Sequence, residues 1–101
     1  MTEAGYVYYT YMRIVWDPAK AKANLRKHGI RFSDADGVLF DSNALTEEIE
    51  NVDGEQRFVS IGLDPLGRLL VVIYIFRGDD IRLISARRAT RRERQAYEAG
   101  I

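Results

Sequence analysis

The only histidine of this 101-residue chain, His28, follows Lys27 and precedes a glycine. An imidazole takes up and releases protons near neutral pH, so His28 is a candidate general acid or base. The ammonium of Lys27 beside it can attract a phosphate. The same residue types also fit the end of a helix, where the macrodipole favours a cation. The residues alone are consistent with both interpretations.

Arginines are the second group with the chemistry of a site. Arg57 and Arg87 are each the polar terminal member of an otherwise apolar strand face, and Arg77, Arg82 and Arg88 stand at strand ends and turns. If the strands of Arg57 and Arg87 are neighbours, two guanidiniums project from one end of a sheet. Such a pair can hold a phosphate and stabilise the charge that develops on it during transfer. The alternative is that these arginines form salt bridges with acidic residues.

Aromatic and acidic residues add weaker candidates. Trp16 and Tyr97 can stack on bases, as aromatics do in single-stranded RNA recognition, although such residues more often pack in a core. Glu47, Glu48 and Glu50 can supply a general base or form the solvated edge of a strand. The sequence contains no Gly-rich phosphate loop, zinc-ligand spacing or nucleophile elbow. Arginine and histidine without a metal site suit cleavage of RNA by its own 2′-hydroxyl, which needs no cofactor.

Composition restricts the class of protein. Apolar residues make up 47% of the chain and charged residues 30%, which is typical of one globular domain. The absence of cysteine excludes disulfides, thiolate zinc sites and cysteine nucleophiles, and it fits a reducing, cytoplasmic compartment. The longest apolar run, 69–76, is far too short to cross a bilayer, so we expect no membrane partner.

The net charge of zero conceals a segregation of charge along the chain. Eight acidic residues and no lysine or arginine lie within 33–56, whereas 82–94 contains six arginines and one acid. A further five cations lie within 20–31. If the fold brings the two basic segments together, they form a patch suited to phosphates; otherwise they are solvated helix faces.

The first elements that carry these residues are a strand at 12–16 and a helix from Asp17-Pro18 to His28-Gly29. The Asp carboxylate can accept hydrogen bonds from the free backbone N–H groups of the first helical turn, and Pro suits the first helical position. Gly readily adopts the left-handed backbone conformation that ends a helix. Ser33 is expected to cap a second, shorter helix that reaches Phe40, and an acidic connection follows.

Three strands are expected at 57–63, 69–76 and 81–87, the second buried on both faces. Simple alternation in the third puts Ile81, Leu83, Ser85 and Arg87 on one face and Arg82, Ile84 and Ala86 on the other. Thr90 and Glu93 form a capping box for a last helix that runs to about Glu98.

This order predicts an α+β fold in which an antiparallel sheet carries two N-terminal helices and one C-terminal helix on one face. We expect one domain over residues 12–101. The Tyr-rich residues 1–11 are interpreted as an N-terminal extension, consistent with an upstream start.

Several phrases together resemble the BrnT toxins of type II toxin-antitoxin modules. They are Ile14-Val15-Trp16-Asp17, Lys27-His28-Gly29-Ile30, Phe32 with the helix to Phe40, Gly54-Glu55-Gln56-Arg57, Ile61-Gly62, Ile84-Ser85-Ala86-Arg87-Arg88-Ala89, Glu93-Arg94 and Tyr97. The resemblance covers about residues 12–98, and its specificity comes from the order and spacing of the phrases. The Tyr-rich residues 1–11 depart from the family pattern.

The resemblance implies a RelE-like ribonuclease fold and metal-independent RNA cleavage that inhibits translation and growth. It also implies a BrnA-type antitoxin with a ribbon-helix-helix domain, whose complex with the toxin binds promoter DNA. Carried onto this sequence, the catalytic positions are His28, Lys27, Arg57 and Arg87. The substrate-binding positions are Trp16, Arg82 and Tyr97.

Two other functions fit the same residues. The first is a non-catalytic nucleic-acid-binding module, in which the basic C-terminal helix binds phosphates and the complex acts only at promoter DNA. The second is an interaction protein whose basic surface binds an antitoxin. Neither requires a reactive His28, so a dependence of RNA cleavage on His28 separates them from the enzyme.

Overall fold

The computed structural model describes residues 12–52 and 54–100. In chain order the elements are β1 (Arg13–Val15), α2 (Pro18–His28), α3 (Phe32–Ala35), the short helix η1 (Asp36–Phe40), β2 (Leu45–Val52), β3 (Glu55–Leu63), β4 (Leu69–Arg77), β5 (Asp80–Arg88) and α4 (Arg91–Ala99). The α+β class is as predicted. The expected extension at residues 1–11 lies outside the described residues.

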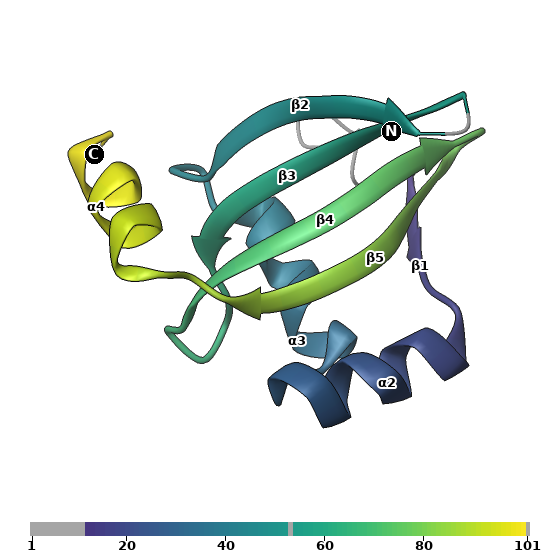
Figure 1. Ribbon diagram of the computed structural model, residues 1–101, viewed down its shortest axis with the longest axis horizontal. Coiled ribbons are helices and arrows are strands. Elements are labelled where there is room, and N and C mark those ends of the chain that lie inside the picture. Colours follow the sequence, from purple (N-terminus) through teal and green to yellow (C-terminus); the bar gives the residue numbers. More distant parts are fainter. Residues whose placement is uncertain (1–11, 53, 101) are drawn as a thin grey trace, which may run out of the picture.

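The five strands form one sheet in the order β1-β5-β4-β3-β2 (Figure 1). β1 runs parallel to β5, and the other neighbouring strands are antiparallel. The prediction of an antiparallel sheet is therefore corrected to a mixed sheet. Short turns reveal hairpins in a sequence, but the pairing of a first strand with a last one leaves no local signal.

The acidic segment before residue 57 was expected to be a connection, with the solvated edge of a strand as the alternative for its glutamates. It is an eight-residue strand, β2, at the sheet edge. It pairs antiparallel with β3, from Leu45 opposite Ile61 to Ile49 opposite Arg57. An edge strand has one free side and few neighbours, so acidic residues are tolerated there and discourage pairing with other chains. Such a strand looks like a loop in the sequence.

The core lies between the sheet and the N-terminal helices. Ile30, Phe32, Ala35, Val38 and Leu39 pack against Leu70, Val72, Tyr74, Ile81, Leu83 and Ala86. In Figure 1 the helical segment that begins with α3 runs behind the strands, α2 lies below the β5 edge, and α4 stands beyond one end of the sheet. The expectation that all helices share one face is therefore wrong for α4.

The first helix begins and ends as its sequence predicts. Asp17 accepts a hydrogen bond from the backbone N–H of Lys20 at 3.1 Å, and Pro18 follows the cap. Gly29 has a φ of 72°, and its N–H donates to the carbonyl of Leu25 at 2.8 Å. The next helix begins at Phe32 without a side-chain cap, so the predicted capping role of Ser33 is wrong.

β5 contains a bulge that changes which residues share a face. Ser85 pairs with Ile73, and Leu83 pairs with the adjacent Tyr74, so Ile84 is an extra residue. Ala86 consequently joins Leu83 in the core, and Ser85 lies on the opposite face. The simple alternation expected for this strand fails after Leu83.

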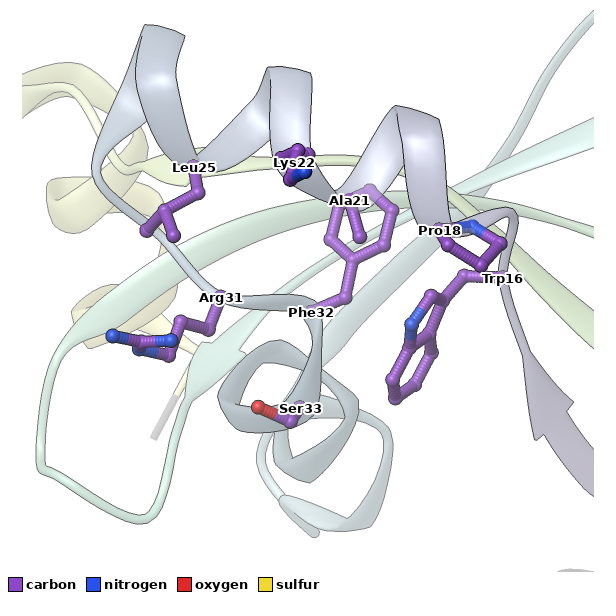
Figure 2. A pocket seen from close by; sticks show the side chains of 8 residues that line it. All are labelled: Trp16, Pro18, Ala21, Lys22, Leu25, Arg31, Phe32 and Ser33. Atoms are coloured by element: carbon purple, nitrogen blue, oxygen red, sulfur yellow. The ribbon is translucent and has the colours of Figure 1, made fainter.

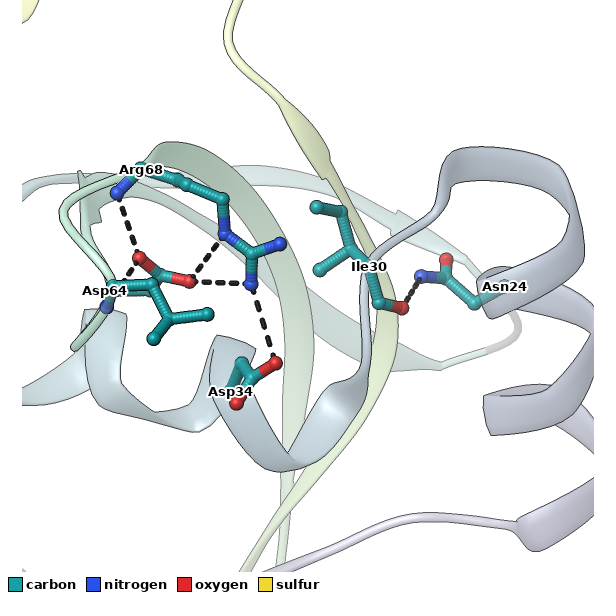
Figure 3. Close-up of polar contacts among 6 residues, drawn as sticks. Asn24, Ile30, Asp34, Asp64 and Arg68 are labelled. Carbon is teal, nitrogen blue, oxygen red and sulfur yellow. Dashed lines mark hydrogen bonds and ion pairs between the residues drawn. The ribbon is translucent and has the colours of Figure 1, made fainter.

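An ion-pair network fastens the β3–β4 hairpin to α3 (Figure 3). Arg68 contacts the carboxylates of Asp64 at 2.7 Å and Asp34 at 3.3 Å. Burial alone would raise the pKa of Asp64, but hydrogen bonds from Arg68 and from the loop backbone lower it.

Within the described residues every helix is too short or too polar to span a lipid bilayer.

Candidate active site

Cross-strand pairing places Arg57 and Arg82 on either side of Ile75. Arg57 pairs with Ile75 between β3 and β4, and Ile75 pairs with Arg82 between β4 and β5. These residues alternate with the core residues Tyr74 and Leu83, so they lie on the sheet surface opposite α2 and α3. The two arginine Cα atoms are roughly 10 Å apart, two interstrand spacings. Both guanidiniums can therefore reach one phosphate.

We call this surface the arginine face. It includes Arg57, Arg82, Ser85, Arg87 and Glu47.

The polar contacts of Arg57 are incomplete. Its Nε is buried and has no hydrogen-bond partner among residues 12–52 and 54–100. A buried donor without a partner costs about 1–3 kcal/mol, so such an atom calls for an explanation. Arg82 forms no ion pair within the same described ranges, whereas Arg77 nearby contacts Glu55 at 2.9 Å. Arg57 and Arg82 are thus the arginines of this face that can receive an anion.

Arg87 lies on the same face but at the other end. It pairs with Val71, four residues along β4 from Ile75 and therefore roughly 13 Å away. β3 and β5 run parallel to each other because both are antiparallel to β4. Arg57, near the start of β3, and Arg87, near the end of β5, therefore lie toward opposite ends of the sheet. The condition for a joint Arg57–Arg87 site, that their strands are neighbours, is not met, because β4 lies between them.

The guanidinium of Arg87 is engaged by Glu93 of α4. Its two terminal nitrogens donate to Oε1 and Oε2 of Glu93 at 2.8 and 2.9 Å. Oε1 also accepts from the N–H of Thr90 at 2.8 Å, which completes the predicted capping box. The hydrogen bonds from Arg87 lower the pKa of Glu93 to about 2. This pair joins β5 to the first turn of α4.

Lys27 and His28 lie at the outer edge of β5. With Lys20, Ala23, Asn24, Ile84 and Ser85 they line a cavity of about 220 Å³. Ser85 belongs to this cavity and also to the arginine face, where it pairs with Ile73. The cationic end of α2 and the arginine face therefore meet at Ser85.

The acidic candidates separate by face. Glu47 pairs with Val59 and lies on the arginine face, two residues along β3 from Arg57. Glu48 pairs with Phe58 on the other face, and it accepts a hydrogen bond from Gln56. The side chain of Glu50 lies outside the described residues. Glu47 is thus the acid that shares the surface of the two available arginines.

Both aromatic candidates make structural contacts. Trp16 packs against the core on the side of α2 and α3, with its ring 6.0 Å from that of Phe32. Tyr97 is buried, and its hydroxyl donates to Oδ2 of Asp41 at 2.7 Å. Burial and the Asp41 carboxylate raise the pKa of Tyr97 to about 12. Tyr97 therefore anchors α4 to the loop after η1.

Sequence reasoning missed the roles of Asn24 and Ser85. Asn24 is a buried polar residue on the apolar side of a helix, and it hydrogen-bonds the backbone of Ala86 and Ile30. That position is a readable signal, because buried amides need partners. No signal could have placed Ser85, since it depends on the bulge at Ile84.

Comparison with known proteins identifies the family. Residues 16–93 match the family model described as "Ribonuclease toxin, BrnT, of type II toxin-antitoxin system". The chain belongs to the BrnT toxin family. The resemblance inferred from the sequence is thereby confirmed at the level of the family.

The fold agrees with this BrnT assignment. It is similar to the crystal structure of the Brucella abortus ribonuclease toxin BrnT, with a TM-score of 0.60 and 28% identity. The match covers 79% of this chain and 99% of that chain. No curated protein matches the sequence. As a BrnT family member the chain is a ribonuclease toxin of a type II toxin-antitoxin system, which implies an antitoxin partner.

Proposed function

We propose that this BrnT toxin is an endoribonuclease that cleaves RNA without a metal ion, on a RelE-like domain over residues 12–101. The 2′-oxygen of the substrate attacks the adjacent phosphorus, and the bond from phosphorus to the 5′-oxygen breaks. A 2′,3′-cyclic phosphate and a free 5′-hydroxyl result. The protein has to orient the phosphate, stabilise its added charge and move two protons.

Arg57 and Arg82 hold the scissile phosphate across Ile75. The observation that carries this assignment is the buried Nε of Arg57, which has no partner in the described part of the chain. When the Arg57 side chain turns toward the substrate, a phosphate oxygen supplies the missing acceptor, because guanidiniums bind phosphates through paired hydrogen bonds. Arg82, on the opposite side of Ile75, adds the second positive charge.

Glu47 and His28 move the protons. Glu47 stands on the arginine face and takes the proton of the 2′-hydroxyl. His28 stands at the β5 edge beside Ser85 and delivers a proton to the departing 5′-oxygen, with Lys27 attracting the neighbouring phosphate. Arg87 supports the face by holding α4 through Glu93. Trp16 and Tyr97 play no part in binding RNA in this assignment.

The cellular consequences follow from the chemistry. Cleavage of messenger RNA in the cytoplasm inhibits translation and growth. A BrnA-type antitoxin with a ribbon-helix-helix domain neutralises the toxin, and their complex, rather than the toxin alone, binds promoter DNA.

The experiment incubates the purified protein with an end-labelled RNA in EDTA. The double variant Arg57→Ala/Arg82→Ala is compared with Arg91→Ala/Arg92→Ala, which removes the same charge from exposed positions of α4. We expect cleavage by wild type and the control, ending in cyclic phosphates, and a loss of about 10²-fold or more in the first variant. Cleavage that EDTA abolishes, or equal rates in both variants, contradicts the proposal. RNA binding without cleavage favours a non-catalytic module.

A further inference from the structure

A second cavity, of about 280 Å³, lies between α2 and α3, on the side of the sheet away from the arginine face (Figure 2). We call it the α2–α3 cleft. Its walls include Trp16, Leu25 and Phe32, and its polar lining is Lys22, Arg31 and Ser33. The proposed RNA chemistry uses none of the polar three.

The floor of the α2–α3 cleft is preformed. Phe32 is a core residue, and the ring of Trp16 meets it edge to face at an interplanar angle of 76°. The cavity is smaller than the roughly 300–1,000 Å³ of typical small-molecule sites. A fixed apolar floor of this size suits one large apolar side chain of a protein partner.

The charged residues that line the cleft are both cations. Lys22 and Arg31 are exposed and form no ion pair within residues 12–52 and 54–100. α2 has no acid in its first turn and ends in Arg26, Lys27 and His28. The complement of an apolar cleft with a cationic border is an amphipathic segment whose apolar residue is flanked by acids.

We propose that the α2–α3 cleft binds the antitoxin by taking one large apolar side chain from an acidic amphipathic helix. The partner is the antitoxin that the family implies, so the inference deepens the proposed function. A nucleobase fits less well. Trp16 and Phe32 meet edge to face and form no stacking platform, and the cleft has few polar groups to read a base edge.

This placement has a mechanistic consequence. The cleft and the arginine face lie on opposite sides of the sheet, so an antitoxin anchored at the cleft need not compete with RNA for Arg57 and Arg82. Substitutions in the cleft should therefore weaken neutralisation while the free toxin keeps its activity.

The test measures binding of the antitoxin encoded in the same operon by titration calorimetry. Lys22→Glu/Arg31→Glu reverses the charge of the border, and Ser33→Trp fills the cleft from an exposed position. The control, Arg91→Glu/Arg92→Glu, makes the same charge change on α4. RNA cleavage by each free variant and its thermal midpoint are recorded beside the affinity.

We expect charge reversal to weaken binding about tenfold at low salt and less at high salt. Filling the cleft should weaken binding about 10- to 100-fold, the value of one buried large side chain. The control and all cleavage rates should stay near wild type. Unchanged affinity in both cleft variants, or an equal loss in the control, overturns the inference.

Two further outcomes distinguish antitoxin binding at the cleft from RNA binding there and from the proposed ribonuclease chemistry. If the cleft variants lose RNA cleavage and keep antitoxin affinity, the cleft is an RNA site and the inference is wrong. If wild type does not cleave RNA but the cleft variants still lose the antitoxin, the inference holds and the proposed ribonuclease chemistry fails.

Discussion

The side-chain amide of Asn24 pairs with both backbone polar groups of Ala86. Its Nδ2 donates to the carbonyl at 2.8 Å, and its Oδ1 accepts from the N–H at 3.1 Å. It thereby acts as one residue of a strand at the edge of β5, beyond the end of β1. Nδ2 also donates to the carbonyl of Ile30 at 3.1 Å (Figure 3). One amide thus fixes the end of α2, and with it Lys27 and His28, against the sheet.

Replacing Asn24 with Ala should lower the free energy of unfolding by about 2–4 kcal/mol, because buried backbone groups lose their partners. Asn24→Asp should cost at least as much, since a carboxylate has no N–H for the two carbonyls. The exposed Asn43→Ala is the control and should change it by less than about 0.5 kcal/mol. Urea unfolding measures all three. Similar values for Asn24→Ala and Asn43→Ala would show that water replaces the amide.

His28→Gln tests proton transfer at the β5 edge. Gln keeps a hydrogen-bonding side chain but cannot carry the proton, so we expect RNA cleavage to fall about 10²-fold. Lys20→Gln lines the same cavity and serves as the control. An unchanged cleavage rate in a folded variant leaves His28 as the end of its helix.

Glu47 and Glu48 offer a matched pair of adjacent carboxylates on opposite faces of β2. We expect Glu47→Gln to lower the cleavage rate about 10²-fold, because the amide cannot accept the 2′-hydroxyl proton. Glu48→Gln should leave the rate near wild type, since its carboxylate contacts Gln56 away from the arginine face. Single-turnover cleavage at saturating enzyme measures both. Equal effects would assign the base to another group.

Arg57→Ala and Arg87→Ala should separate catalysis from stability. Arg57 has no polar partner for its buried Nε in the described chain, so its removal should cost about 10²-fold in rate and little stability. Arg87→Ala leaves Glu93 without its ion pair and should lower the free energy of unfolding by about 1–3 kcal/mol. Thermal melts and initial cleavage rates are recorded for each. A stable Arg87→Ala protein that has lost all cleavage would return Arg87 to the catalytic group.

The elements with strong local signals were predictable from the sequence. Asp17 with Pro18, Gly29, and the Thr90 capping box each fix a helix end through hydrogen bonds to residues within one turn. β2 was predicted only as an alternative to a connection, because an exposed edge strand has few neighbours to impose an apolar pattern. The parallel pairing of β1 likewise depends on a partner more than sixty residues away.

For the candidate site the sequence indicated residue types but not their arrangement. It offered Arg57 with Arg87 for a phosphate and, through the family resemblance, Arg82 for substrate binding, whereas the shared position of Arg57 and Arg82 around Ile75 follows from the strand order. Arg87 would stand beside Arg57 only if their strands were neighbours, and β4 separates them. The bulge at Ile84 then decides that Ser85 joins the arginine face. Such irregularities arise from packing, which periodicity does not encode.

The Arg87–Glu93 pair also predicts how stability depends on pH. The pKa of Glu93 is lowered from 4.5 to about 2, chiefly by hydrogen bonds from Arg87. The unfolded carboxyl titrates near the ordinary value, so this contribution is complete above about pH 4.5 and is lost as the pH falls towards about 2. Because the pair is partly exposed, screening reduces it to about 1–2 kcal/mol.

Glu93→Gln removes this contribution, and urea unfolding from pH 7 to pH 2.5 measures it. The variant should be less stable at pH 7, and the difference from wild type should shrink as the pH falls below about 4.5, because the carboxyl of Glu93 takes up a proton in the unfolded chain before it does so in the folded protein. The difference in the free energy of unfolding is the informative quantity. The pKa values of Asp41 and Asp64 are also lowered, so both proteins lose the same stability through these two groups in acid. A difference that stays constant with pH would mean that Glu93 acts only through its uncharged capping of Thr90.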